Sequence, residues 1–300
     1  MEKKIEQLLG RSRRSFMAGA GALGAAALVT GCADSGTITV TPPAAGVTDN
    51  DILNFALNLE YLEAEFYLRA ATGSGLSAAD AGTGAGTVTG GSQVSFAGSP
   101  VVQQYAVEIA QNELNHVRYL RNALGSNAVS RPNIDFTAGF NGAAMAAGIG
   151  STFNPFMDVP SFLVGSFVFE DVGVTAYTGA ATLITSKTIL SAAAGIQAVE
   201  AYHAAEIRTL IAGGAAMAGA PQAYLTAANQ ISALRGTLGG GNETKLSISS
   251  IVAADSTNAI AFSRTTDQVL HIVYAAGAGV QTKGGFFPNG LNGTIKATAS

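Results

Sequence analysis

The sequence predicts an all-α fold: a four-helix bundle with one long crossover between its second and third helices, followed by an extra helix and an irregular tail. Three observations predict it. Long segments repeat apolar residues at spacings of three and four, the period of a helix buried along one face. Residues 125–159 are long enough to cross a bundle from end to end. Two Glu-x-x-His pairs occur in a chain that has only three histidines.

The amino end predicts an export signal rather than part of the fold. Residues 1–14 carry five basic and two acidic side chains, and a short apolar run rich in Ala and Gly follows. This run is too short and too weakly apolar for a spanning helix. The motif Ser-Arg-Arg-Ser-Phe-Met around Arg13 and Arg14 resembles the twin-arginine signal, which exports folded, often cofactor-loaded proteins. We expect a signal peptide over residues 1–31.

The only cysteine, Cys32, ends the motif Leu-Val-Thr-Gly-Cys, which resembles the lipobox of bacterial lipoproteins. Val29 stands where Leu is commoner, so plain cleavage near residues 25–27 remains the alternative. Residues 32–48 are small, polar and contain proline, which fits a flexible tether. We therefore expect a periplasmic or cell-envelope protein, anchored to the membrane by a lipid on Cys32.

Net charge argues against a nucleic-acid-binding protein, and cysteine content excludes a protein stabilised by an internal disulfide. Without the signal peptide the chain has 11 basic and 18 acidic residues, a net charge of −7. That balance argues against nucleic acid as a partner. A single cysteine excludes an internal disulfide.

Helix-end signals place the first two helices. Thr48 or Asp49 can cap the first helix, and Gly73 can end it. Pro100 suits the first position of the second helix, and Gly125 can end that one. The loop between them is rich in Gly, Ser and Thr and should lie on the surface. The expected bounds are about 50–71 for the first helix, 72–99 for the loop and 100–124 for the second helix.

The second half of the chain predicts another helix pair and an extension. A three-residue link joins the third and fourth helices, and three consecutive glycines end the helical part. The long connection holds at most one short helix, near residues 141–148. The expected helices are about 161–184, 188–214, 221–236 and, in the tail, 265–276. The chain then divides into a bundle with its fifth helix over 49–236 and an extension over 237–300 that packs on it.

The two Glu-x-x-His pairs are Glu113 with His116 and Glu200 with His203, on the second and fourth helices. Residues three apart share one helix face, so each pair can aim a carboxylate and an imidazole at one point. Bundles that bind two metal ions add one Glu from each of the other two helices. Glu170 is the only Glu of the third helix, in an apolar setting where a lone carboxylate is costly unless paired or metal-bound.

Three glutamates on the first helix compete for the same role. Glu60 lies on the apolar face and is favoured as the ligand. Glu63 lies one turn further along that face and is expected as an auxiliary group. Glu65 points elsewhere.

Each of the first and third helices also carries a tyrosine two turns after its glutamate. Tyr67 follows Glu60 by seven residues, and Tyr177 follows Glu170 by seven. The chain therefore looks like a duplicated pair of helices. The phenols are expected to hold the ligand carboxylates in place by hydrogen bonds.

Other polar residues near these positions have open roles. Asp171 can accept a hydrogen bond from a ligand imidazole or belong to a local polar network. Glu206 lies one turn after His203 and can orient its ring. Otherwise Glu206, like Glu63, Glu65 and Arg208, is expected as a charge on a helix face.

Together these residues resemble the ferritin-like superfamily. The segment 58–68, the two Glu-x-x-His pairs and Glu170 occur in the order that this superfamily shows. The leader, the Gly-rich loop and the tail resemble its exported branch, related to desiccation-related proteins, over about residues 48–295. The resemblance implies two Fe or Mn ions with the middle carboxylates bridging. The implied ligands are Glu60, Glu113, His116, Glu170, Glu200 and His203.

Such a ligand set bounds the chemistry. Carboxylates with one imidazole per metal suit Fe or Mn. The implied reactions are Fe(II) oxidation, peroxide reduction and catalase-like disproportionation, so the expected partner is a metal ion or a small oxidant, O₂ or peroxide. The alternative is a non-catalytic envelope protein of stress or desiccation with a vestigial or structural metal site. The tether, tail and loop would crowd a closed shell, so we expect a monomer or small homo-oligomer.

Overall fold

The fold is described from a computed structural model, which places residues 46–217, 222–277 and 279–299. The expected signal peptide with Arg13 and Arg14, the lipidation site Cys32 and nearly all of the tether lie outside these residues.

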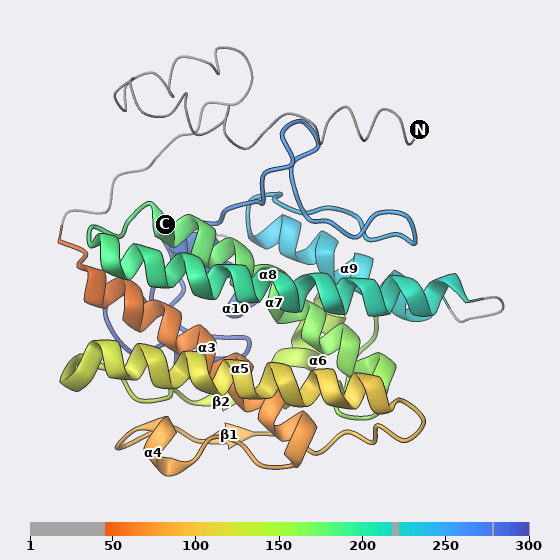
Figure 1. The fold of residues 1–300 in the computed structure, drawn as a ribbon, viewed down its shortest axis with the longest axis horizontal. Coiled ribbons are helices and arrows are strands. Elements are labelled where there is room, and N and C mark those ends of the chain that lie inside the picture. Colours follow the sequence, from red (N-terminus) through yellow and green to blue (C-terminus); the bar gives the residue numbers. More distant parts are fainter. Residues whose placement is uncertain (1–45, 218–221, 278, 300) are drawn as a thin grey trace, which may run out of the picture. The chain divides into compact units, whose positions relative to one another are not determined.

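Four long helices build the bundle, as the sequence predicts (Figure 1). One pair is α3 with α5, the other is α7 with α8, and α3 also packs on α7. The chain runs the length of the bundle between α5 and α7, which confirms the single long crossover. The bounds are Asp49–Thr72 for α3, Pro100–Leu124 for α5, Val159–Ala181 for α7 and Lys187–Ala216 for α8.

Local signals start and end these helices. Thr48 caps α3 through a capping box with Asp51, and Gly73 ends it with a φ of 81°, which suits glycine. Asp158 and Ser186 cap α7 and α8, each by accepting a hydrogen bond from a backbone N–H three residues on. The helix ends therefore follow from short sequence patterns.

Helix α7 is the most buried helix of the bundle. It is long and apolar enough to span a membrane by length and composition, but 89% of its most apolar window is buried inside the protein. Its apolarity is therefore that of a core helix. Aromatic side chains such as Phe162 and Phe169 pack from it onto Phe66 of α3, with ring centroids 5.7 and 5.3 Å away.

The loop after α3 and the crossover are tied together. Strand β1 (Val88–Thr89) pairs in parallel with β2 (Ile134–Asp135), and α6 (Phe136–Ala146) follows directly. The loop also contains the short helix α4 (Ala78–Ala81), and η1 (Gly125–Asn127) ends α5.

The loop over residues 72–99 does not lie wholly on the surface, which corrects the expectation. Val94 and Phe96 are buried, and the Phe96 ring lies 5.5 Å from that of Phe162. A mostly polar loop thus contributes two apolar anchors to the core.

The chain after the bundle covers one side of it. Helix α9 (Ala223–Leu238) packs on α7 and α8, and α10 (Thr266–Val273) packs on α7 and α9. The tail adds the buried Phe286 and Phe287 to the core, and Asn58 of α3 donates a hydrogen bond to the carbonyl of Asn292.

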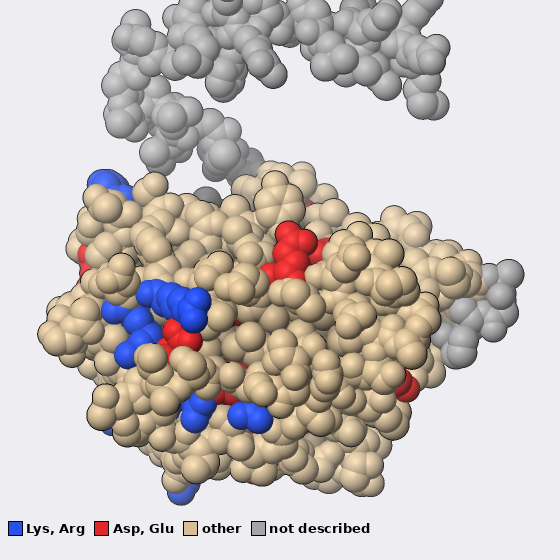
Figure 2. All heavy atoms as spheres, turned by 60° about the horizontal axis from the view of Figure 1, so that its bottom comes forward, with Lys and Arg blue, Asp and Glu red and all other residues tan. Residues whose placement is uncertain are grey.

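Charged side chains are sparse on the face shown in Figure 2, where Lys and Arg gather around a few acidic side chains. Only 12% of the residues are Asp, Glu, Lys or Arg. Several of these are buried, which directs attention to the interior.

Candidate metal centre

Each of the four bundle helices contributes one glutamate to a buried group of side chains that also contains two imidazoles. The glutamates are at most 1% exposed, and the imidazoles belong to residues 8% and 3% exposed. These residues form two groups that share Glu113, and within each group one ligand atom per residue lies within 4.8 Å of the others. We call them the carboxylate cluster: Glu60, Glu113, His116 and Glu200 in one group, and Glu113, Glu170 and His203 in the other.

Glu113 occupies the middle of the carboxylate cluster. Its Oε1 lies 2.9 Å from Nδ1 of His203, and its Oε2 lies 3.4 Å from Nδ1 of His116. Glu200 also approaches His116, with Oε1 3.5 Å from Nδ1. A carboxylate that turns one oxygen to each imidazole has the arrangement of a bridging ligand.

Glu60 and Glu170 each face one imidazole. The Oε2 atom of Glu60 lies 3.2 Å from Nδ1 of His116, and Oε2 of Glu170 lies 3.5 Å from Nδ1 of His203. The two halves of the cluster therefore match, with one outer carboxylate and one imidazole in each.

The two tyrosines hold the outer carboxylates crosswise. Tyr67 of α3 donates to Oε1 of Glu170 on α7, and Tyr177 of α7 donates to Oε1 of Glu60 on α3. Seven residues span about 10 Å of helix, so both bonds form only if α3 and α7 run antiparallel. Each phenol thus fixes one oxygen and leaves the other facing the cluster.

Without bound cations, the cluster balances its charge with protons. Burial raises the pKa of Glu60 to about 7, with attraction to His116 opposing this rise. Burial and the charge of Glu113 raise the pKa of Glu200 well above its usual value. Burial opposes the protonated form of His203, but attraction to Glu170 and Glu113 raises its pKa to about 11.

Several cluster atoms have no hydrogen-bond partner within the described part of the chain. They are both carboxylate oxygens of Glu113 and of Glu200, Oε2 of Glu170 and Nδ1 of His203. Their approaches to one another and to His116, at 2.9–3.5 Å, lack the geometry of hydrogen bonds. Buried polar atoms are normally paired, because leaving them unpaired costs free energy. These atoms face one another within the cluster, and a hard divalent or trivalent cation bound among them would supply the missing partner. Oxygen ligands with one imidazole per ion fit Fe or Mn.

Glu63 lies closer to the cluster than a helix-face charge would. It is 4% exposed, and burial together with the charge of Glu200 raises its pKa well above its usual value. Gly173 of α7 makes room for both carboxylates, because a Cβ there would collide with Oε2 of Glu200 and lie 3.2 Å from Oε1 of Glu63. In the sequence, the glycine three residues after Glu170 was the only feature that could have indicated that a carboxylate such as that of Glu63 lies there.

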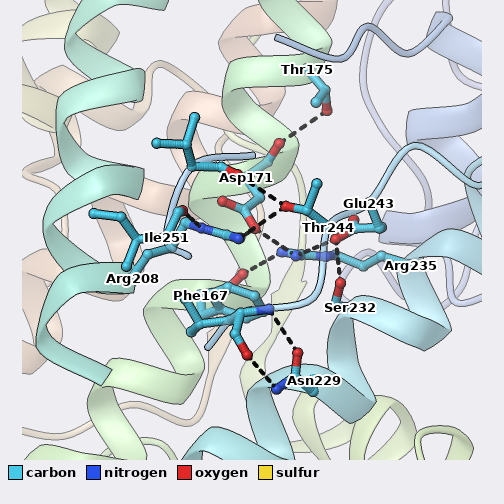
Figure 3. A network of polar contacts seen from close by, with 12 residues as sticks. Phe167, Asp171, Thr175, Arg208, Asn229, Ser232, Arg235, Glu243, Thr244 and Ile251 are labelled. Atoms are coloured by element: carbon cyan, nitrogen blue, oxygen red, sulfur yellow. Dashed lines mark hydrogen bonds and ion pairs between the residues drawn. The ribbon is translucent and has the colours of Figure 1, made fainter. Parts of the chain in front are cut away.

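Asp171 does not reach a ligand imidazole, which corrects one of its two expected roles. Its Oδ2 accepts hydrogen bonds from Arg208 and Arg235, each 2.7 Å long (Figure 3). Arg235 also binds Glu243, whose other oxygen accepts from Arg264 at 2.7 Å. We call these five residues the arginine network. Arg208 is 2% exposed and so is not a helix-face charge.

Glu65 differs from its expected role as a charge on a helix face, and Glu206 does not take one of its two expected roles, that of orienting His203. Glu65 is buried and paired with Arg69 and Arg131, away from the cluster. Glu206 is half-buried, and among the described residues no hydrogen bond joins it to His203.

Sequence reasoning missed the residue that does contact the outer edge of His203. The amide of Asn112 lies 3.2 Å from Nε2 of His203, while Nδ1 of the ring faces the carboxylates. Asn112 directly precedes Glu113 on α5, but nothing in the sequence alone distinguishes it from a surface asparagine.

Comparisons with known proteins agree with this geometry. A model of the ferritin-like domain family matches residues 48–213. The chain is 29% identical over 271 residues to the ferritin-like catalase Nec2 of Nesocodon mauritianus, which covers 82% of this chain and 84% of that protein. It is 31% identical over 251 residues to the desiccation-related protein PCC13-62 of Craterostigma plantagineum, covering 76% and 78%.

Proposed function

The chain belongs to the ferritin-like domain family, and we propose that its carboxylate cluster binds two Fe or Mn ions and acts as a di-metal oxidoreductase. The observation that carries this proposal is the set of buried cluster atoms without hydrogen-bond partners in the described chain. Buried carboxylate and imidazole atoms without hydrogen-bond partners are costly, and they are expected where a metal ion binds them.

The chain supplies one outer pair and shared ligands for each ion. Glu60 with His116 would hold one ion, and Glu170 with His203 the other. Glu113, which both groups share, would lie between them, and Glu200 would join it from the group of His116. The bound pair would supply one-electron steps between the divalent and trivalent states, which suit the oxidation of Fe(II) and the consumption of O₂ or peroxide.

The surrounding residues fix protons and orientation. The pKa values of Tyr67 and Tyr177 lie well above the usual value because of burial and the neighbouring carboxylates, so both phenols stay protonated and donate. Ligand imidazoles bind a metal through a deprotonated nitrogen, so metal binding would release protons from His116 and His203. With Nδ1 of His203 as the ligand, Nε2 carries the ring proton. The amide nitrogen of Asn112 lies 3.2 Å from Nε2, so the amide would have to turn its oxygen to this position to accept that proton.

Peroxide disproportionation is the reaction we favour among those open to the site. It needs no second organic substrate: two H₂O₂ give two H₂O and one O₂. The relative named ferritin-like catalase supports this choice, because the alignment covers 82% of the present chain.

The alternative is a non-catalytic envelope protein of stress or desiccation, with a structural or vestigial metal site. It is favoured by the similarity to a relative named desiccation-related protein. In this case the ions would stabilise the bundle without turning over.

We also propose that the protein is exported, anchored through Cys32 and monomeric or a small homo-oligomer. The basic, twin-arginine amino end and the motif before Cys32 support export and anchoring. Sizing in solution and mass spectrometry of the mature amino end test these points. A free, uncleaved amino end would overturn the anchor.

The decisive experiment loads the purified protein with Fe(II) or Mn(II), counts metals per chain and follows peroxide and O₂. We expect about two metals per chain and turnover. Glu170→Ala and His203→Ala should lose metal, whereas His271→Ala, at the third histidine, should retain it because His271 lies outside the cluster. Fewer than one metal per chain would overturn the proposal, and binding without turnover would favour the alternative.

A further inference from the structure

The carboxylate cluster comes nearest to solvent beside His116. Residue His116 is 8% exposed, whereas the cluster glutamates are at most 1% exposed. It lines a groove of about 380 Å³ with Tyr119 of α5 and with Gly195 and Ile196 of α8. Helix α5 packs mainly on α3, and α8 mainly on α7, so the α5–α8 seam is the loosest side of the bundle.

The lining of this groove is apolar next to the cluster. His116 and Asn115 provide its nitrogen groups, Tyr119 adds a phenol, and none of the described lining residues is Lys, Arg, Asp or Glu. Tyr119 and Ala192 also line an adjoining hollow that contains Lys187. A molecule that approaches His116 through this hollow would therefore pass the positive side chain of Lys187 and then the apolar part of the groove.

This lining favours a small uncharged molecule over a metal cation. Lys187 repels divalent ions, and the apolar part of the groove offers no carboxylate to replace their water shell. Two acidic side chains near the surface, Glu108 and Glu206, lie on the other side, toward His203. Asp49, next to Lys187 in space, is bound by Thr185 and Ser186.

Another hollow at the cluster is too small for a route. It lies beside Glu63 and Gly173, has a volume of about 20 Å³ and is lined otherwise by apolar side chains. That is room for one water molecule. The groove over His116 is therefore the better entrance.

We propose that the groove between α5 and α8 over His116 admits a small uncharged oxidant, hydrogen peroxide or dioxygen, to the metal centre. The inference rests on the proposed function, since it assumes that the cluster holds metal. It adds where the oxidant enters, which face of the bundle must stay open and why the metal ion is not expected by the same path.

A plug in the groove tests this entrance. A Cβ added at Gly195 meets nothing within 4 Å, so Gly195→Phe can fill the groove, and Phe suits a helix interior better than Gly. Ala192→Phe is a second plug on the same helix. Gly213→Phe is the matched control: Gly213 lies on α8, is open in the same way, and is roughly 27 Å further along.

The probe is nitric oxide, a neutral diatomic molecule, mixed anaerobically with the Fe(II)-loaded protein. Iron per chain and the association rate of nitric oxide are measured by metal analysis and stopped-flow absorbance. We expect both plugs to retain iron but to slow association by about tenfold, and the control to leave it unchanged.

The possible outcomes separate the two ideas. Equal association rates in the plugs, the control and the unaltered protein, all with iron bound, would overturn the entrance and leave the metal site standing. Absence of bound iron in the unaltered protein would overturn the metal site and the entrance with it. Slow iron loading in the plugs alone would show that the groove admits the cation, and this too would overturn the inference.

Discussion

Glu170 and Asp171 are neighbours on α7, yet their carboxylates enter two different buried clusters. Glu170 joins the carboxylate cluster beside His203. Asp171 joins the arginine network between Arg208 and Arg235 (Figure 3). One step along a helix turns a side chain by about 100°, which is enough to separate the two environments.

The two clusters differ in what completes them. In the arginine network, Asp171 and Glu243 each bind two guanidinium groups from other parts of the chain. In the carboxylate cluster, the oxygens of Glu113 and of Glu200 approach the two imidazoles but form no hydrogen bond of good geometry in the described chain. The carboxylates of the first cluster are therefore neutralised by guanidinium groups, although Nε of Arg235 and of Arg264 has no hydrogen-bond partner in the described chain. The carboxylates of the second cluster require protons or metal ions.

The largest expected effect breaks the arginine network. Asp171→Ala leaves two buried guanidinium groups without their shared partner, and we expect the free energy of unfolding to fall by about 3–5 kcal/mol. Urea unfolding measures it. Asp158→Ala, which removes only the cap of the same helix, is the control and should cost about 1 kcal/mol. A loss as small as the control's would mean that the network does not hold α8 and α9 on α7.

The next effect concerns pH and the metal-free carboxylate cluster. The pKa of Glu60 is raised from 4.5 to about 7 in the folded protein, so the folded state binds this proton more tightly than the unfolded state. The apo-protein should therefore lose about 3 kcal/mol of stability as pH rises from 4.5 to 7. The pKa of His203, raised from 6.5 to about 11, extends the loss above pH 6.5.

Unfolding of the apo-protein at several pH values checks this slope. Glu60→Gln should reduce the loss between pH 4.5 and 7 by the contribution of Glu60, because its amide does not titrate. Glu200 and Glu63, whose pKa values are also raised, would retain their contributions. The metal-loaded protein should show little of the loss, since bound ions replace the protons. Stability that rises with pH in the apo-protein over this range would contradict the charge balance inferred for the cluster.

The third effect compares the neighbours directly. Gln keeps the shape of Glu170 and the oxygen that accepts from Tyr67, so Glu170→Gln should change apo stability by less than about 1 kcal/mol. It should, however, remove the stabilisation by one bound ion, about 2.7 kcal/mol at a metal concentration 100 times Kd. Asp171→Asn should show the reverse pattern. If the two variants changed apo stability and stabilisation by metal to the same extent, the two clusters would not differ in the way we infer.

The same contrast explains which features the sequence could predict. Thr48 and Pro100 are local signals, and Glu113 with His116 forms a pair within one helical turn, so the helices and the carboxylate cluster were predictable. Arg235, in contrast, meets Asp171 across 64 positions of sequence, and no pattern on one helix identifies such a partner.

The direction of the helices was equally hidden. The seven-residue spacing predicted that the phenols would hold carboxylates, but the crossed pairing of Tyr67 with Glu170 depends on α3 and α7 running antiparallel. Spacing within a helix gives the face of a residue. Only the assembled bundle gives the neighbour that this face meets.

The smallest expected effect tests that crossed pairing. Tyr177→Phe removes the donor to Oε1 of Glu60, and we expect about 1 kcal/mol less stability with a roughly tenfold loss of metal affinity. Tyr61→Phe is the control, because Tyr61 is also buried but bonds to Arg121 and the carbonyl of Val129, away from the cluster. It should lose stability and retain metal affinity. Unfolding curves and metal titration of both variants decide the point: equal metal affinities would mean that the phenol packs against Glu60 without orienting it.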